Sequence, residues 1–264
     1  MGSPLTAPID QALASRAVAG DRLTAADLTA LAAVDDILAL GALADDARRA
    51  RRGAEASWGR VLDVAAAAVV AGPIEVPPGA GEVRLHGLPD TLASAVAAVT
   101  AVRAAAGSCP VTGFSLADLA ARAAEGWGDL GDIAAALKAA GLDAVAEAPV
   151  DRLIDPAAAV RPVLEAGLRV PRAIVADAVP AAGRVDLLLA VRALQDATGA
   201  LTVFAPLPRH VPDAVPTTGY DDVRMVALAL LLTALLLAYF NLRGRALSPA
   251  IAEARLQALQ ARIR

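Results

Sequence analysis

The stretch 183–208 constrains the fold most, because a helix pattern, a helix stop and a strand pattern follow one another in it directly. Its first half forms one apolar helical face from Leu187, Leu188, Val191 and Leu194. Gly199 then predicts the helix C-terminus. Residues 200–207 are β-branched, aromatic and bounded by proline, which indicates a short buried strand. A helix followed at once by a buried strand is one unit of a parallel α/β fold.

Composition and charge limit the class of protein. Of the 264 residues, 57% are hydrophobic and only 3% are aromatic, and the mean hydropathy is +0.54. This composition suits helices packed closely on a parallel sheet, although it also leaves a membrane protein as an alternative. The net charge of -4 argues against a nucleic-acid partner, because phosphate contacts require clustered Lys and Arg. The opening MGSPLT lacks the charged and apolar regions of a signal peptide, so we expect a cytoplasmic protein.

Two segments resemble one known family. RVDLLLAVRALQDATGALTVFAPLP at 184–208, with TGYDDVRMVALALLL at 218–232, resembles the late barrel segment of the radical SAM enzymes of menaquinone biosynthesis, aminofutalosine synthase and dehypoxanthine futalosine cyclase. DRLTAADLTALAAVDDILALGALADDARRARRG at 21–53 is similar to the helical extension before the barrel in that family. The resemblance implies a TIM-like βα barrel, here partial or shrunken. It places a helical N-terminal extension at 1–57 and the barrel at 58–264.

The reaction centre of that family is missing from this sequence. Family members hold an iron–sulfur cluster through CxxxCxxC after the first strand, which we expect at 60–70. Residues 65–81 contain no cysteine, and Cys109 is the single cysteine of the chain. A cluster of this type needs three thiolates, so we expect no 4Fe–4S cluster and no SAM binding. Radical SAM chemistry is therefore not expected, and whether the chain is an enzyme is left open.

Polar residues at the ends of the expected strands are the candidates for a ligand site. In a TIM-like barrel the loops after the strands form the active-site face. The residues that fall there are His86, Gly87, Ser115, Glu147, Asp177 and His210. The histidines could equally be satisfied structural residues at strand ends. No spacing such as HxxxH supports a metal site, and we predict none.

Three functions remain compatible with these observations. The first is a cluster-less relative of the futalosine-pathway enzymes that acts around menaquinone biosynthesis as a partner, regulator or small-molecule binder. The second is an enzyme with non-radical chemistry on a futalosine-like substrate at the barrel mouth. The third is a small membrane-anchored protein. Because a shortened barrel leaves sheet edges and apolar helix faces uncovered, we also expect a homo-oligomer or a complex with a complete family member.

The segment 225–242 carries no charged residue, and arginines follow it. At about 1.5 Å per residue it would fall just short of a hydrocarbon core of roughly 30 Å, so membrane contact is an alternative. The resemblance instead makes its first part a barrel helix. We expect a buried or interface helix there.

Overall fold

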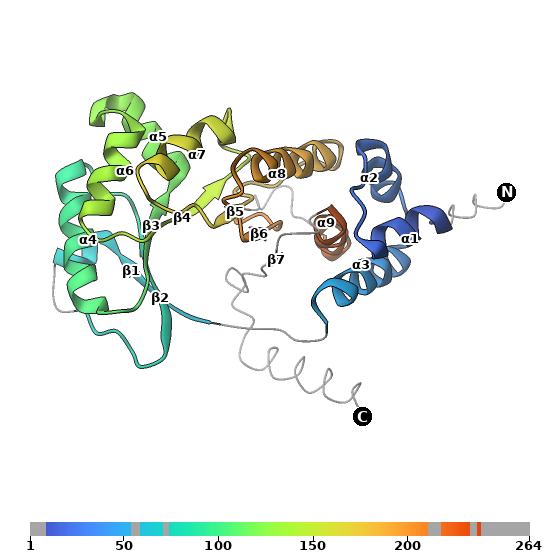
Figure 1. Cartoon of the computed structure of the whole chain (residues 1–264), viewed down its shortest axis with the longest axis horizontal. Helices are drawn as coiled ribbons and strands as arrows, with labels where there is room; N and C mark the ends of the chain where they lie inside the picture. The colour runs from blue at the N-terminus through green and yellow to red at the C-terminus, as the bar shows by residue number, and fades with distance from the viewer. Residues whose placement is uncertain (1–8, 54–58, 71–73, 211–217, 233–236, 239–264) are drawn as a thin grey trace.

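The computed structural model describes residues 9–53, 59–70, 74–210, 218–232 and 237–238. Its centre is a parallel sheet of seven strands in which each strand pairs with its neighbour in sequence (Figure 1). The strands are β1 (Arg60–Ala65), β2 (Ala80–His86), β3 (Val111–Ser115), β4 (Ala144–Pro149), β5 (Arg172–Ile174), β6 (Val203–Ala205) and β7 (Leu237–Ala238). The sheet curls into a half-barrel, and the prediction of a partial TIM-like barrel is confirmed.

Helices form the crossovers between most strands. They are α4 (Leu92–Ala106), α5 (Leu116–Arg122), α6 (Leu130–Ala139), α7 (Pro156–Glu165), α8 (Arg184–Thr198) and α9 (Gly219–Leu232). In the described part of the first crossover, only the short 3-10 helix η1 (Ala66–Val70) follows β1. A single turn covers less of the sheet than the α-helices of the other crossovers do. Three further helices precede the sheet: α1 (Gln11–Ala19), α2 (Ala25–Ala32) and α3 (Ile37–Arg52).

Local sequence signals place several helix ends. Thr24 and Asp27 form a capping box at the start of α2, and Gly199 ends α8, as predicted, with φ 62°. Residues 150–155 connect β4 to α7 through turns. Asp155 accepts a hydrogen bond from the Ala158 amide and caps α7, whose first residue is Pro156. Proline suits that position because the first helical N–H needs no acceptor within the helix.

The apolar core lies between the convex face of the sheet and its helices. Val83 and Leu85 of β2 are at most 1% exposed, and they meet a buried face of α4 that contains Val99 and Val102. The intervening residues Glu82, Arg84 and His86 project to the other, concave face, because side chains alternate along a strand. The inside of the half-barrel is therefore polar along this strand.

The three N-terminal helices form a group that packs against α8 and α9. Helix α3 contacts α9, and α2 contacts both α8 and α9 (Figure 1). Arg51 of α3 donates to the carbonyl oxygens of Ala17 (2.9 Å) and Leu230 (3.0 Å), and its partial burial lowers its pKa. It thereby joins the C-terminal ends of α1 and α9. The predicted boundary at residues 57 and 58 lies outside the described residues and stays a prediction.

Within the ranges that the structure describes, no helix is long and apolar enough to cross a membrane. Helix α9 contains the first part of the apolar segment 225–242 and ends at Leu232. Its Met225, Leu228 and Leu231 are buried, as expected for a helix packed against its neighbours. Residues 233–236 and 239–242 of the segment lie outside the described residues.

Candidate functional site

A cavity of about 440 Å³ opens at the carboxyl ends of the first four strands. Its polar lining comes from β1, β2, β3, β4, helix α5 and the loop after β6. These polar residues are Asp63, Arg84, His86, Ser115, Asp118, Glu147, Arg209 and His210. The volume lies within the range of about 300 to 1,000 Å³ that is common for small-molecule sites.

The structure brings five of the six predicted residues to this cavity: His86, Gly87, Ser115, Glu147 and His210. Asp177 is not among the lining residues. Its carboxylate accepts hydrogen bonds from Arg152 at 2.9 and 3.0 Å, which hold the pKa of Asp177 below its ordinary value. A backbone bridge joins Asp177 to His210, so Asp177 supports the loop that carries a lining residue. The ligand-binding role of all six residues stays a prediction.

A buried charged cluster underlies the cavity. Glu82 accepts hydrogen bonds from the Arg84 Nε (2.9 Å) and the Thr112 hydroxyl (2.6 Å), and its second oxygen pairs with the Arg172 Nη2 at 3.1 Å. Because β2 and β5 are separated by two strands, the Glu82–Arg172 pair can form only across the inside of a curled sheet. Burial raises the pKa of Glu82, but the two arginines and the hydroxyl outweigh it and lower that pKa overall.

Phe114 changes the direction of the chain at the cavity wall. It has φ 61°, a left-handed conformation that is costly for a bulky residue, of order 1–3 kcal/mol. Phe114 is 3% exposed and belongs to the apolar core, and both it and the following Ser115 are among the residues that line the cavity. Ser115 takes the N-cap position of α5, but its hydroxyl makes no capping hydrogen bond. The Ser115 side chain therefore lies at the cavity and accepts no hydrogen bond from the first amides of α5.

An ion pair links two walls of the cavity. The Arg209 Nη1 lies 2.6 Å from the Glu147 Oε2, so the loop after β6 is tied to the end of β4. The Arg209 amide donates to the Ala176 carbonyl at 3.1 Å, which fixes the same loop to the end of β5. The pair is partly exposed, and solvent weakens its contribution to stability.

The sequence analysis did not include Asp63, Arg84, Asp118 or Arg209 among the candidate ligand-binding residues. A signal for Arg84 was present, because Glu82, Arg84 and His86 alternate with apolar residues and a half-buried strand with this pattern has a polar face. No comparable signal marked Arg209. Its place depends on the curl of the sheet, which sequence periodicity does not report.

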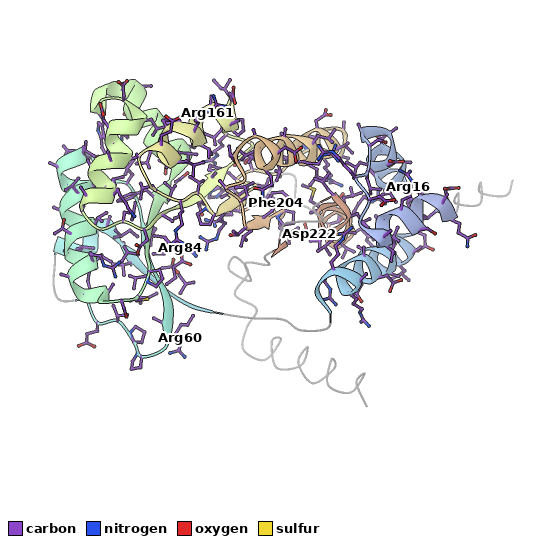
Figure 2. All side chains as sticks on the ribbon, viewed as in Figure 1. Arg16, Arg60, Arg84, Arg161, Phe204 and Asp222 are labelled. Carbon is purple, nitrogen blue, oxygen red and sulfur yellow. The ribbon has the colours of Figure 1, made fainter. Side chains whose placement is uncertain are left out.

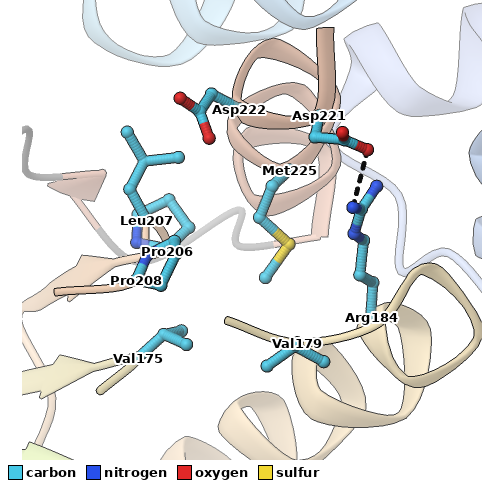
Figure 3. Close-up of a pocket in the computed structure, with 9 residues that line it drawn as sticks. All are labelled: Val175, Val179, Arg184, Pro206, Leu207, Pro208, Asp221, Asp222 and Met225. Atoms are coloured by element: carbon cyan, nitrogen blue, oxygen red, sulfur yellow. Dashed lines mark hydrogen bonds and ion pairs between the residues drawn. The ribbon is translucent and has the colours of Figure 1, made fainter. Parts of the chain in front are cut away.

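A second, much smaller cavity lies between the β6 loop and α9 (Figure 3). Its volume of about 20 Å³ is enough for a water molecule and not for a metabolite. At its edge, Arg184 donates to Asp221 at 2.7 Å. Hydrogen bonds from the Thr218 hydroxyl and from Arg184 lower the pKa of Asp221 to about 2. These contacts tie the start of α9 to α8, and we assign them a structural role.

The single cysteine lies away from the cavity. Cys109 precedes β3, and its Sγ is 3.3 Å from the carbonyl oxygen of Ala80, the first residue of β2. Both positions are at the amino ends of the strands, whereas the cavity is at the carboxyl ends. Among the described residues, no group of three or more His, Cys, Asp or Glu side chains is arranged to hold a metal ion.

Comparison with solved structures shows that other proteins share this fold. The chain is similar to methylornithine synthase (PylB), with a TM-score of 0.57 and 11% identity over 86% of this chain and 78% of that one. It is also similar to HydG, a maturase of the FeFe-hydrogenase, with a TM-score of 0.59, 12% identity and 86% of this chain covered. For HydG from Carboxydothermus hydrogenoformans the TM-score is 0.55 and the identity 11%, again over 86% of this chain.

The chain spans 62% and 64% of the two HydG chains. No protein-family model and no curated protein matches the sequence. Identities of 11% and 12% show the fold alone, and function must be argued from the site.

The residues of this chain do not fit the iron–sulfur cluster that such a fold suggests. A cluster that binds SAM needs three thiolates close together, and this chain has one cysteine, at the far end of the strands. The polar side chains that line the cavity are carboxylates, arginines, histidines and a hydroxyl group.

Proposed function

We propose that this protein binds a small polar metabolite in the cavity at the carboxyl ends of its strands, and that it does so without radical SAM chemistry. The observation that carries the proposal is the cavity of about 440 Å³ with ionisable side chains on several of its walls. A half-barrel that only needed to be stable would fill its interior with branched apolar side chains. This interior instead contains a buried Arg84 and a partly buried Glu82–Arg172 pair.

Two further features support a binding site. The left-handed Phe114 lies in the cavity wall, and such strained positions cluster at functional sites. The Ser115 hydroxyl is available at the same wall because it does not cap α5. A ligand would meet both charged groups and a neutral hydrogen-bonding group there.

We further propose that the ligand belongs to menaquinone biosynthesis by the futalosine route, with the protein acting as a binder, regulator or partner. The sequence resemblance at 21–53 and 184–232 is the support for this pathway. Association with itself or with a complete family member is part of the same proposal, since the outer edges of β1 and β7 pair with no other strand in the described part of the sheet.

Affinity-selection mass spectrometry with a defined metabolite library that includes futalosine and dehypoxanthine futalosine tests the proposal. The variant Ser115→Tyr should block the cavity, and Ser15→Tyr makes the same chemical change on the exposed surface of α1. We expect a library member to bind the wild type and Ser15→Tyr but not Ser115→Tyr. Binding that is equal in all three proteins, or no binding to the wild type, would refute the proposal. Binding of other metabolites but neither futalosine compound would refute the pathway alone.

A further inference from the structure

Arg84 is labelled on β2 in Figure 2. It is the most deeply buried charged residue at the cavity, with 7% of its surface exposed. Its Nε donates to Glu82 at 2.9 Å. Its Nη2 also lies 2.9 Å from the same carboxylate oxygen, but the direction is unsuitable for a hydrogen bond. Among the described residues, the Arg84 Nη2 has no hydrogen-bond acceptor. A buried guanidinium N–H without an acceptor lowers the stability of the folded protein, unless another group accepts a hydrogen bond from it.

Glu82 cannot fully neutralise this arginine. Its one negative charge is shared between Arg84 and Arg172, and its Oε1 also accepts from the Thr112 hydroxyl. The cluster therefore holds the Arg84 side chain in the wall of the cavity, with its Nε bound to Glu82 and its Nη2 without a hydrogen-bond acceptor among the described residues. Fixed, buried donors of this kind bind carboxylates and phosphates strongly because the hydrogen bonds are charge-assisted.

The acidic neighbours of Arg84 limit the charge of the ligand. Asp63 is the register partner of Arg84 on the adjacent strand, about 4.8 Å away, and it lines the same cavity. Glu147 and Asp118 line it as well, Glu147 being paired with Arg209. A dianionic phosphate would be repelled by these carboxylates, whereas a single carboxylate with a neighbouring donor group could bind Arg84 and donate to Asp63.

We propose that Arg84 binds the carboxylate of the ligand and that Asp63 accepts a hydrogen bond from a hydroxyl or amino group beside it. This inference rests on the proposed function and specifies its ligand class: a small hydroxy- or amino-carboxylic acid. Glu82 positions Arg84, and Arg172 and Thr112 position Glu82. The ligand class follows from the charges of the cavity wall and not from any solved relative.

The test on the wild-type protein uses a library of hydroxy-carboxylic acids, from L-lactate to 3-hydroxybenzoate, each paired with its neutral carboxamide. Ligand-observed NMR gives the dissociation constants, and inorganic phosphate is included. We expect acids to bind roughly 10- to 100-fold more tightly than their carboxamides, the effect of one hydrogen bond between charged groups, and phosphate to bind weakly. This comparison needs no substitution and so does not depend on variant folding.

Two variants then test whether the preference for acids over carboxamides depends on Arg84. Arg84→Gln should lose the preference for acids, whereas Arg103→Gln removes a half-buried, ion-paired arginine at the other end of the strands and should keep it. Equal binding of acids and carboxamides, tighter binding of phosphate, or an unchanged preference in a folded Arg84→Gln would overturn this inference while the proposed function stands. If neither this library nor the metabolite library binds, both fail.

Discussion

The substitution Glu82→Gln tests whether the inside of the half-barrel is held together by charge. It keeps the shape of the side chain but removes the counter-charge of Arg84 and Arg172, whose side chains are 8% and 11% exposed. Removing one charge of a buried pair typically destabilises a protein by about 3–5 kcal/mol, because the opposite charge stays desolvated and loses its attraction. We expect the free energy of unfolding of Glu82→Gln to fall by about that amount, measured by urea denaturation.

The matched control is Glu125→Gln. Glu125 pairs with Arg122 at 2.9 Å, but its side chain is 59% exposed, and exposed pairs contribute about 0–1 kcal/mol. Since the folded pKa of Glu82 lies below its ordinary value of 4.5, its stabilising effect is present above that pH and is lost as the pH falls through the folded pKa. The difference between wild type and Glu82→Gln should therefore shrink with acidification. Equal stabilities of Glu82→Gln and wild type at neutral pH would refute the account of this cluster.

Four other predictions follow from the structure and the sequence. Gly141→Ala should destabilise the protein by more than about 1 kcal/mol, because Gly141 has φ 104° and a Cβ there would lie 2.5 Å from the Arg103 side chain. The control Gly41→Ala adds a Cβ in open space within α3 and should stabilise the protein by about 0.5–1 kcal/mol. Thermal unfolding in which Gly141→Ala is the more stable variant would contradict this prediction. Anaerobic reconstitution should give no stable iron–sulfur cluster, with the same residual iron in wild type and Cys109→Ser; 5′-deoxyadenosine production from SAM would contradict this. Light scattering should show an oligomer, and a monomer at high concentration that binds no complete family member would argue against the partner proposal. After an alkaline carbonate wash the protein should be in the supernatant, and retention in the pellet would favour membrane insertion of 225–242.

Sequence patterns predicted the elements with strong local signals. The apolar face of α8 and its terminal Gly199 depend on neighbouring residues, and the structure has both. The sequence also predicted that the candidate ligand-binding residues lie at the carboxyl ends of the strands, because parallel strands end at a common edge of the sheet. The Glu82–Arg172 pair was not predictable from the sequence, because the two residues are 90 positions apart and meet only when the sheet curls. The Phe114 conformation likewise has no sequence signal, because bulky residues rarely adopt it.

Arg51 bonds to carbonyl groups of both α1 and α9, and these contacts affect the order in which the chain folds during synthesis. Arg51 bonds to a carbonyl 179 positions later, and Arg224 donates to the Val34 carbonyl 190 positions earlier. The N-terminal helices therefore leave the ribosome long before the helix that covers them exists. At about 5–20 residues per second, they would expose their apolar faces for roughly ten seconds or more. Contacts of such high sequence separation also slow folding, so this docking should be among the last steps and a point at which chaperones act.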